Sequence, residues 1–363
     1  MKLVSVIART KPLCFDLAGN LLLSKSHRVY IKTVSGKLSF LFGFKESKLN
    51  KLLSFFPLWF RMKRLGVMAA ISSGDDFFFT HGRKIYRYNM EHRLLSEELV
   101  FTQGRGPLKF CEVKGIPGFS DSICFGEYFG NHERKSIKIF QRKIDGAWLS
   151  PFKFENGEIN HVHALIPDVT NECIWILTGD FEHSAAIYQA RNDFQDVELI
   201  LGGEQKFRSC VAFPVSNGIL YATDTQMENN SIRLLTQKQG QWVSEKLFDI
   251  NGSCIYGCEI KDFYIFSTST EPSEKRKGFL RKLFDNKPAS GILENKSDIL
   301  SVRKSDFDFK LVASVNKDVW PYRLFQFGTI MFPSNSDNSN RLYAYNVGSK
   351  SNDLSTECYD LSE

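Results

Sequence analysis

Two histidines and one aspartate occur close together in the stretch HVHALIPDVTNECIWILTGD, residues 161–180. Imidazole nitrogens and a carboxylate can exchange protons with a substrate or bind a divalent metal ion. His161 and His163 alternate along a strand-like run, so both side chains face one side, about 6 to 7 Å apart. With His183 and Asp180 they supply enough donors for zinc, but the spacing is unspecific. We therefore expect no cofactor, and a divalent metal at His161, His163 and Asp180 is the alternative. For His163 we expect a hydrogen bond to a backbone carbonyl.

This stretch is one copy of a repeat. Short apolar runs that end in small or acidic polar groups recur, mostly at intervals of 44 to 51 residues, with a longer last interval: FFFTHG at 77, SICFGEY at 122, CIWILTGD at 173, ILYATDT at 219, FYIFSTST at 263 and TIMFPSNS at 329. One strand-like segment precedes each run and others follow it, separated by Gly, Asn and Asp turns. Four short strands per unit at this period are typical of a β-propeller.

We therefore predict one all-β domain over 1–363, a six-bladed β-propeller, with seven blades as the alternative. The N-terminal strands in VYIKTVSGKLSFLFGF (29–44) are expected to close the ring by pairing the two chain ends. Three further features complete this prediction: a helical segment at 46–66 with a break at Pro57, a basic insertion at 271–291 and a polar C-terminal tail at 349–363.

The repeat also predicts which side chains meet. In an antiparallel pair, the start of the innermost strand lies beside the end of the second strand, so both border one mouth of the channel. The expected start residues are Lys109, His161, Arg208, Tyr256 and Tyr322. The expected end residues are Glu127, Asp180, Asp224, Ser269 and Asn335. Three pairs would place a potential cation beside a carboxylate: Lys109 with Glu127, His161 with Asp180, and Arg208 with Asp224.

We assign possible roles by chemistry. The catalytic candidates are Glu127, His161, Asp180, Asp224 and Tyr256. The ligand-binding candidates are Lys109, His183, Arg208, Ser269, Tyr322 and Asn335. A concave mouth with converging polar groups favours a ligand site, although strand-end aspartates also hold turns by bonding backbone amides.

Composition limits the class of protein. Hydrophobic residues make up 42% and charged residues 24% of the chain, as in globular proteins. The net charge of +6 does not require nucleic acid or an anionic membrane as partner. The eight cysteines show no CxxC pair, which favours free thiols in a reducing compartment. With no signal peptide and no apolar run long enough to cross a membrane, we predict a cytoplasmic protein.

The segments DGAWLSPFKF, HVHALIPDVTNECIWILTGD and ILYATDT recur in a propeller register that resembles the sialidase-like, Asp-box group of bacterial propellers, over residues 64–346. KIDGAW at 143 and QKQGQW at 237 are the nearest equivalents of its S-x-D-x-G-x-T-W box. Sialidases use an arginine triad, a Tyr and Glu pair and an Asp acid. The resemblance implies that Arg208 matches one arginine, and Tyr256 or Tyr322 the tyrosine.

These observations predict a carbohydrate-related propeller that binds or processes a glycan or sugar precursor at its channel mouth. If it is an enzyme, a pair of carboxylates suits glycoside hydrolysis. The alternative is a non-catalytic protein-interaction propeller, with residues 46–66 or 271–291 as the partner contact.

Overall fold

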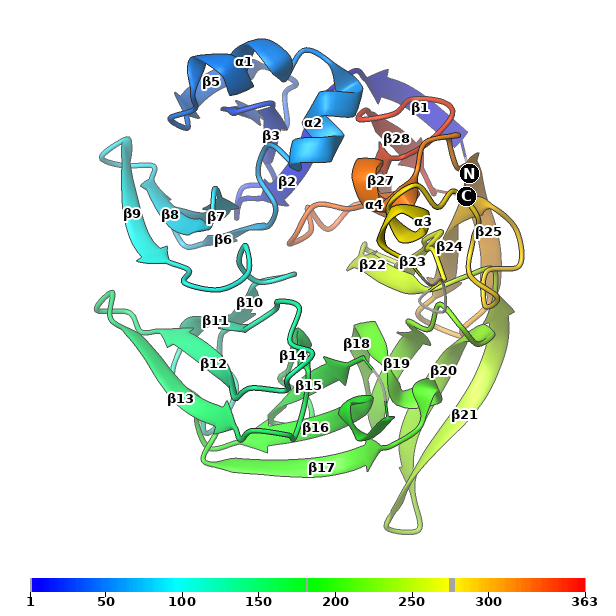
Figure 1. Cartoon of the computed structure of the whole chain (residues 1–363). Helices are drawn as coiled ribbons and strands as arrows, with labels where there is room; N and C mark the ends of the chain where they lie inside the picture. The colour runs from blue at the N-terminus through cyan, green and yellow to red at the C-terminus, as the bar shows by residue number, and fades with distance from the viewer. Residues whose placement is uncertain (1, 181, 274–277, 363) are drawn as a thin grey trace.

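A computed structural model describes residues 2–180, 182–273 and 278–362. Within them, seven four-stranded antiparallel sheets follow one another around a ring (Figure 1). This arrangement is a seven-bladed β-propeller. The predicted all-β propeller is confirmed, whereas the preferred number of six blades is wrong and the alternative of seven is right.

Six blades are each built from four strands in sequence order, starting at the central channel. Blade 1 consists of β2 (Lys11–Phe15), β3 (Leu21–Lys25), β4 (Arg28–Lys32) and β5 (Leu38–Gly43). Blade 2 consists of β6 (Ala70–Ser73), β7 (Asp76–His81), β8 (Lys84–Asn89) and β9 (Leu94–Val100). Blade 3 consists of β10 (Cys111–Val113), β11 (Ser122–Gly126), β12 (Ile137–Arg142) and β13 (Trp148–Phe154). Blade 4 consists of β14 (His161–Asp168), β15 (Cys173–Gly179), β16 (Ala186–Arg191) and β17 (Asp196–Gly202). Blade 5 consists of β18 (Ser209–Val215), β19 (Gly218–Thr223), β20 (Asn230–Lys238) and β21 (Gln241–Ile250). Blade 6 consists of β22 (Cys254–Glu259), β23 (Phe263–Thr268), β24 (Lys296–Arg303) and β25 (Phe309–Asn316).

Blade 7 joins the two ends of the chain. It contains β26 (Thr329–Met331), β27 (Arg341–Val347), β28 (Thr356–Asp360) and, as its outermost strand, β1 (Lys2–Ile7). Pairing of β1 with β28 joins the N-terminal strand to the sheet of the C-terminal strands, which closes the ring (Figure 1). The N-terminus does close the ring, but through residues 2–7 rather than the predicted 29–44, which form the outer strands of blade 1.

The expected polar tail at 349–363 is in fact part of this blade. Thr356 and Glu357 are buried in β28, although both residue types are polar. The Thr356 hydroxyl donates to the carbonyl of Thr10 at 2.6 Å, and the Glu357 carboxylate accepts from the Tyr359 hydroxyl at 2.6 Å. Polar side chains can be buried when such bonds replace those to water, so composition alone mislabelled this strand.

The core lies between neighbouring blades and uses the abundant phenylalanines. Phe42 of blade 1 stacks on Tyr88 of blade 2 with ring centroids 4.6 Å apart, and Phe213 of blade 5 stacks on Tyr264 of blade 6 at 4.8 Å. Aromatic rings fill the wedge between twisted sheets with large apolar area. All eight cysteines are free, and seven of them are buried in these layers.

Short helices cover one end of the ring. They are α1 (Lys48–Leu53), α2 (Pro57–Lys63), α3 (Phe279–Leu283) and α4 (Tyr322–Phe325), with 3-10 turns at Glu182–Ser184 and Gln205–Phe207. The predicted helical segment 46–66 thus forms α1 and α2, and α2 starts at Pro57. Residues 274–277 of the expected basic insertion lie outside the described residues. In the described part of the chain, no helix is long and apolar enough to span a membrane.

Candidate functional site at the channel mouth

Four of the predicted residues meet at one mouth of the channel, from blades 4 and 5. His161 is the first residue of β14 and Asp180 follows β15, while Arg208 precedes β18 and Asp224 follows β19. Asp180 Oδ1 lies 3.3 Å from His161 Nε2 and 3.2 Å from Arg208 Nη2. The same Nη2 atom is 3.5 Å from Asp224 Oδ2. We call these residues, together with His163, the mouth cluster.

A β-bulge sets the position of His163. In the pairing of β14 with β15, Val162 faces Thr178 and Ala164 faces Leu177, so His163 is the extra, unpaired residue. Bulges of this kind redirect a side chain. The ring of His163 occupies space beside Gly179, where a Cβ atom would lie 2.1 Å from it. Glycine at 179 therefore lets His163 reach within 3.0 Å of His161, Nε2 to Nε2.

The charges of the mouth cluster are strongly coupled. Burial by itself would raise the pKa of Asp180, but its close contacts with the His161 and His163 rings and the charge of Arg208 outweigh it and lower that pKa. Burial would likewise lower the pKa of Arg208, but the carboxylates of Asp224 and Asp180 raise it instead. Both charges are therefore held, and Asp180 is a poor proton donor at neutral pH.

Several residues of this region were not predicted. The Cys210 thiol donates to Asp224 Oδ2 at 3.2 Å, and Arg208 Nη1 donates to Gln226 Oε1 at 3.0 Å. The buried Glu271 carboxyl has its pKa raised to about 8, chiefly by burial and then by the nearby Asp224 charge. Cys210 is the unpaired residue of a bulge in β18, and a repeat pattern that assumes regular strands does not reveal such positions.

Three other predicted residues lie near the channel but form different contacts. Ser269 is buried and its hydroxyl donates to Glu271 Oε1 at 3.1 Å. Lys109 and Glu127 do not form the expected pair among the described residues. Instead, Glu127 Oε2 accepts from the backbone amide of Lys138 at 2.8 Å, and burial lowers the pKa of Lys109. The bond to the amide ties the end of β11 to β12, so the Glu127 carboxylate makes a structural contact.

Tyr256 lines the channel, where burial raises the pKa of its hydroxyl. The other three predicted residues lie elsewhere. Tyr322 belongs to α4 and donates to Asn295 Oδ1 at 2.8 Å, because the segment YRLF is helical rather than a strand. Asn335 follows the innermost strand β26, so it belongs to the opposite end of that blade. His183 lies at the rim, where its Nε2 is 2.9 Å from the carbonyl of Gly157.

A cavity of about 970 Å³ opens beside the mouth cluster. Its walls come from blade 1, helices α1 and α2 and the residues that follow them, and the channel side chains Tyr128 and Tyr256. Tyr128 connects the cavity to the mouth cluster, because its ring centroid lies 4.5 Å from that of His161. A second cavity of about 400 Å³ shares Lys11, Leu108 and Tyr256 with the first and extends further along the channel.

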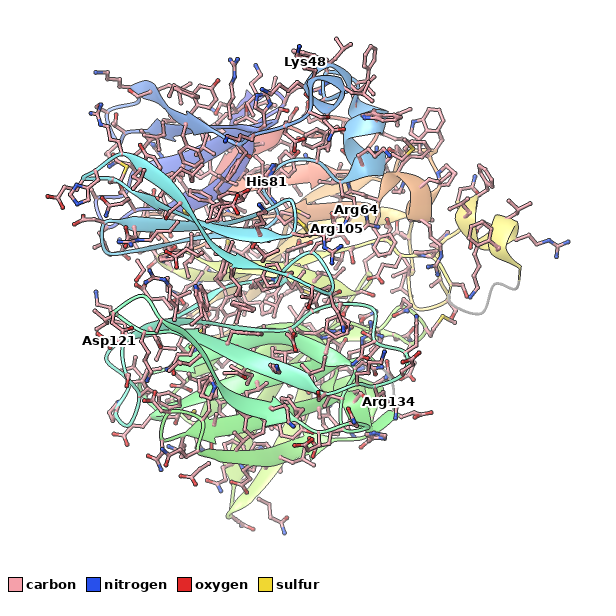
Figure 2. All side chains as sticks on the ribbon, turned by 60° about the vertical axis from the view of Figure 1, so that its left-hand side comes forward. Lys48, Arg64, His81, Arg105, Asp121 and Arg134 are labelled. Atoms are coloured by element: carbon pink, nitrogen blue, oxygen red, sulfur yellow. The ribbon has the colours of Figure 1, made fainter. Side chains whose placement is uncertain are left out.

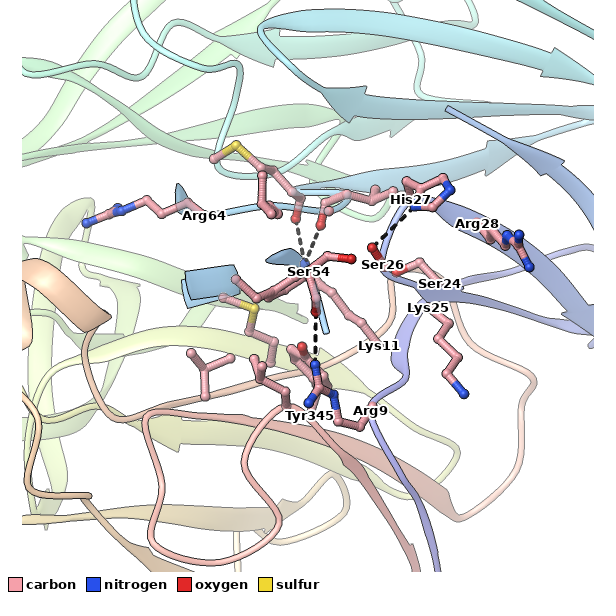
Figure 3. A pocket seen from close by; sticks show the side chains of 18 of the residues that line it. Arg9, Lys11, Ser24, Lys25, Ser26, His27, Arg28, Ser54, Arg64 and Tyr345 are labelled. Carbon is pink, nitrogen blue, oxygen red and sulfur yellow. Dashed lines mark hydrogen bonds between the residues drawn. The ribbon is translucent and has the colours of Figure 1, made fainter. Parts of the chain in front are cut away.

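The larger cavity is lined by cations and by no acidic residue in the described part of the chain. The cations are Arg9, Lys11, Lys25, Arg28, Lys51 and Arg64. All of them except Lys51 are labelled in Figure 3. Within the described ranges, none of them forms an ion pair with a carboxylate; Arg9, for example, donates to the carbonyls of Ser54 and Phe55. Figure 2 shows Arg64 near Arg105, which adds a further cation at this face. We call this hollow the cationic cavity.

The comparisons with known proteins agree with the fold. No protein-family model and no curated protein matches this sequence. Among solved structures, an oligogalacturonate lyase from Vibrio parahaemolyticus matches 99% of this chain over 92% of its own length, with a TM-score of 0.57 and 9% identity. An oligogalacturonate lyase in complex with manganese has a TM-score of 0.55 at 9% identity, covering 98% of this chain and 96% of that one. The AfRom2 CNH domain has a TM-score of 0.54 at 7% identity, covering 100% and 98%. Such identities show the propeller fold alone.

Proposed function

We propose that this propeller binds an anionic, sugar-containing molecule in the cationic cavity. The observation that carries the proposal is a set of six Arg and Lys side chains around a single hollow, which have no carboxylate partner among the described residues. Cations gathered around one concave, partly apolar wall raise the local concentration of anions there.

The wall also suits a sugar. Tyr30, Phe55, Phe60 and Tyr128 offer ring faces, and Ser24 and Ser54 offer hydroxyls among the lining residues. Ring faces pack against the apolar side of a sugar, while hydroxyls and cations bind its polar edge. Oligogalacturonate lyases, whose named substrate is an acidic sugar, share the fold, which supports the same ligand class here.

Binding fits the mouth cluster better than glycoside hydrolysis does. A hydrolase needs one carboxylic acid that keeps its proton and one ionised partner. The pKa of Asp180 is lowered rather than raised, and Glu127, whose pKa burial raises, accepts from a backbone amide. Glu271 keeps its proton, but its side chain is buried and bonded to Ser269 rather than open to a substrate. The hydrolase prediction and the sialidase-like assignment therefore stay predictions.

Binding can be tested by calorimetry with short galacturonate oligomers, using neutral galactose oligomers of the same length as the ligand control. We expect the combined variant Lys25→Ala, Arg28→Ala and Arg64→Ala, whose three side chains are exposed, to weaken binding about tenfold or more. The matched control is Lys238→Ala, Lys246→Ala and Arg303→Ala, which removes the same charge from the outer strands β20, β21 and β24.

Equal binding of neutral and acidic oligomers, or equal losses in the two variants, would contradict the proposal. We also expect no change in oligomer length after incubation. Cleavage that gives saturated products, as hydrolysis does, and that is lost in Asp180→Asn would instead support the hydrolase prediction.

A contact with another protein is the second candidate function. Leu49 of α1 and Phe279 and Leu280 of α3 do not line the cationic cavity, and all three are more than half exposed. Large exposed apolar side chains of this kind often mark interaction surfaces. Leu49→Ser with Phe279→Ser should leave oligogalacturonate binding unchanged if this surface serves a separate partner.

A further inference from the structure

The Nε2 atoms of His161 and His163 face each other. His161 Nδ1 lies 3.1 Å from the carbonyl of Phe129, and His163 Nδ1 lies 2.9 Å from the carbonyl of Ser209. A carbonyl oxygen only accepts hydrogen bonds, so each Nδ1 must carry a proton. In the neutral rings both Nε2 atoms then hold a bare lone pair, and these atoms are 3.0 Å apart. Two lone pairs at this distance repel each other unless a cation lies between them.

Asp180 adds a third electron-pair donor. Its Oδ1 atom lies 3.3 Å from His161 Nε2 and 3.4 Å from His163 Nε2. Zinc bonds of about 2.1 Å at tetrahedral angles separate neighbouring ligand atoms by about 3.4 Å. The three separations of 3.0, 3.3 and 3.4 Å are thus near those of ligand atoms around one small divalent ion.

We propose that His161, His163 and Asp180 bind a divalent transition-metal ion of the zinc type, with at least one coordination position left open. Two imidazoles and a carboxylate are a recurrent ligand set for zinc and for other first-row metals. The bonds from both Nδ1 atoms to backbone carbonyls fix the tautomer and the ring orientation, as in known metal sites. This inference does not depend on the proposed ligand of the cationic cavity.

The surroundings support this assignment. The imidazole of His163 is 1% exposed and that of His161 7%, whereas Asp180 is 28% exposed and links the cluster to solvent. Arg208 Nη2 lies 3.2 Å from Asp180 Oδ1, and the positive charge of this guanidinium opposes the binding of a metal cation. Asp224 offsets that charge because its Oδ2 lies 3.5 Å from the same guanidinium nitrogen.

A second possible ligand set lies deeper. His163, Cys210 and Asp224 also offer donor atoms within 4.8 Å of one another. However, the Cys210 thiol donates its proton to Asp224, and both residues are buried. A metal there would have to displace that proton and would lack the solvent access that Asp180 provides. The outer set is therefore the one that we assign.

Zinc is the probe for the test. The purified full chain is stripped of metal with a chelator, dialysed against micromolar zinc chloride and analysed for bound zinc. A second stripped sample is loaded with cobalt for visible spectroscopy. We expect one zinc ion per chain and a cobalt spectrum of low coordination number without thiolate charge transfer. Asp180→Asn, which preserves the side-chain shape, and His161→Ala should each weaken zinc binding by about tenfold to a hundredfold.

His183→Ala is the matched control, because this histidine lies at the rim and contacts Gly157 and Arg134. It should bind zinc like the original chain. Circular dichroism of the metal-free proteins checks folding, and if His161→Ala does not fold, Asp180→Asn carries the test. The proposal is overturned if the original chain binds no zinc, which is the result expected if one histidine is an imidazolium. It is also overturned if Asp180→Asn binds zinc normally or if the cobalt spectrum shows a thiolate band.

Discussion

Arg208 and Asp180 belong to neighbouring blades, yet Arg208 Nη2 lies 3.2 Å from Asp180 Oδ1. The repeat pattern paired each of them only with a residue of its own blade. The structure shows that Arg208 also reaches Asp224 and so joins two carboxylates across the boundary between blades 4 and 5. The arginine therefore links the blades electrostatically at the point where the innermost strands begin.

Arg208→Met should destabilise the fold strongly. It leaves Asp224, whose side chain is 5% exposed, and Asp180 without their shared cation. Removing one partner of a buried pair costs about 3 to 5 kcal/mol, which urea denaturation would measure as a lower midpoint. Arg134→Met is the control, because its ion pair with Glu182 is largely exposed and should contribute little. Similar losses in both variants would argue against a special role for Arg208.

Glu271→Gln should change how stability depends on pH. The pKa of Glu271 is raised to about 8 in the folded chain, against an ordinary value near 4.5. Between these values the folded state keeps a proton that the unfolded state has lost, so the free energy of unfolding falls as pH rises towards 8. Glutamine has no proton to lose, so the variant should lose less stability between about pH 5 and pH 9. Urea unfolding midpoints measured across this pH range test the prediction. If stability depends on pH in the same way in Glu271→Gln and in the original chain, the raised pKa of Glu271 is refuted.

Lys11 should make ligand binding in the cationic cavity sensitive to alkali. Burial lowers the pKa of Lys11 to about 8, and its Nζ donates to the carbonyls of Val67 and Met68. Below that pH the ammonium attracts an anion, and above it the charge is lost. Galacturonate affinity should therefore fall between about pH 7 and pH 9, and Lys11→Arg should reduce this fall because arginine stays charged. An unchanged pH profile in Lys11→Arg would place the titrating group elsewhere.

Gly126→Ala should disturb the contact between blades 3 and 4. A Cβ atom at this position would lie 2.3 Å from Cβ of Val162, which is buried beside the mouth cluster. Overpacking of this kind costs about 1 to 3 kcal/mol, and thermal unfolding would show it as a lower midpoint. Gly130→Ala is the matched control, since no atom lies within 4 Å of its added Cβ. Adding Val162→Ala to Gly126→Ala should not restore the loss, because alanine keeps the Cβ atom that lies 2.3 Å away.

The repeat of strands could be read from the sequence because each blade alternates buried and exposed side chains between turn residues. His161, Asp180, Arg208 and Asp224 were placed together for a related reason. Antiparallel pairing puts the start of one strand beside the end of the next, whatever lies between them. His163 was expected to bond a backbone carbonyl, and it does so with Ser209.

The number of blades was wrong because β2 to β5 form a complete blade, whereas residues 29–44 were expected to be closing strands. The strands that do close the ring look unlike the others. Residues 2–7 are mostly exposed, and residues 356–360 carry polar side chains that become buried only when hydrogen-bonded within the sheet. The same limit applies to Asn335 and Tyr322, whose places depend on where β26 ends and on a helix that packs against its neighbours.

The sequence by itself determined the strand pattern and the polar character of one channel mouth, since both follow from local alternation and turn chemistry. Only the tertiary structure decided that His163 joins His161 and Asp180, because this requires a bulge and the missing side chain of Gly179. It also decided that six cations from separate segments line one hollow. Contacts between residues far apart in the chain depend on how blades pack, and a repeat pattern contains no information on that packing.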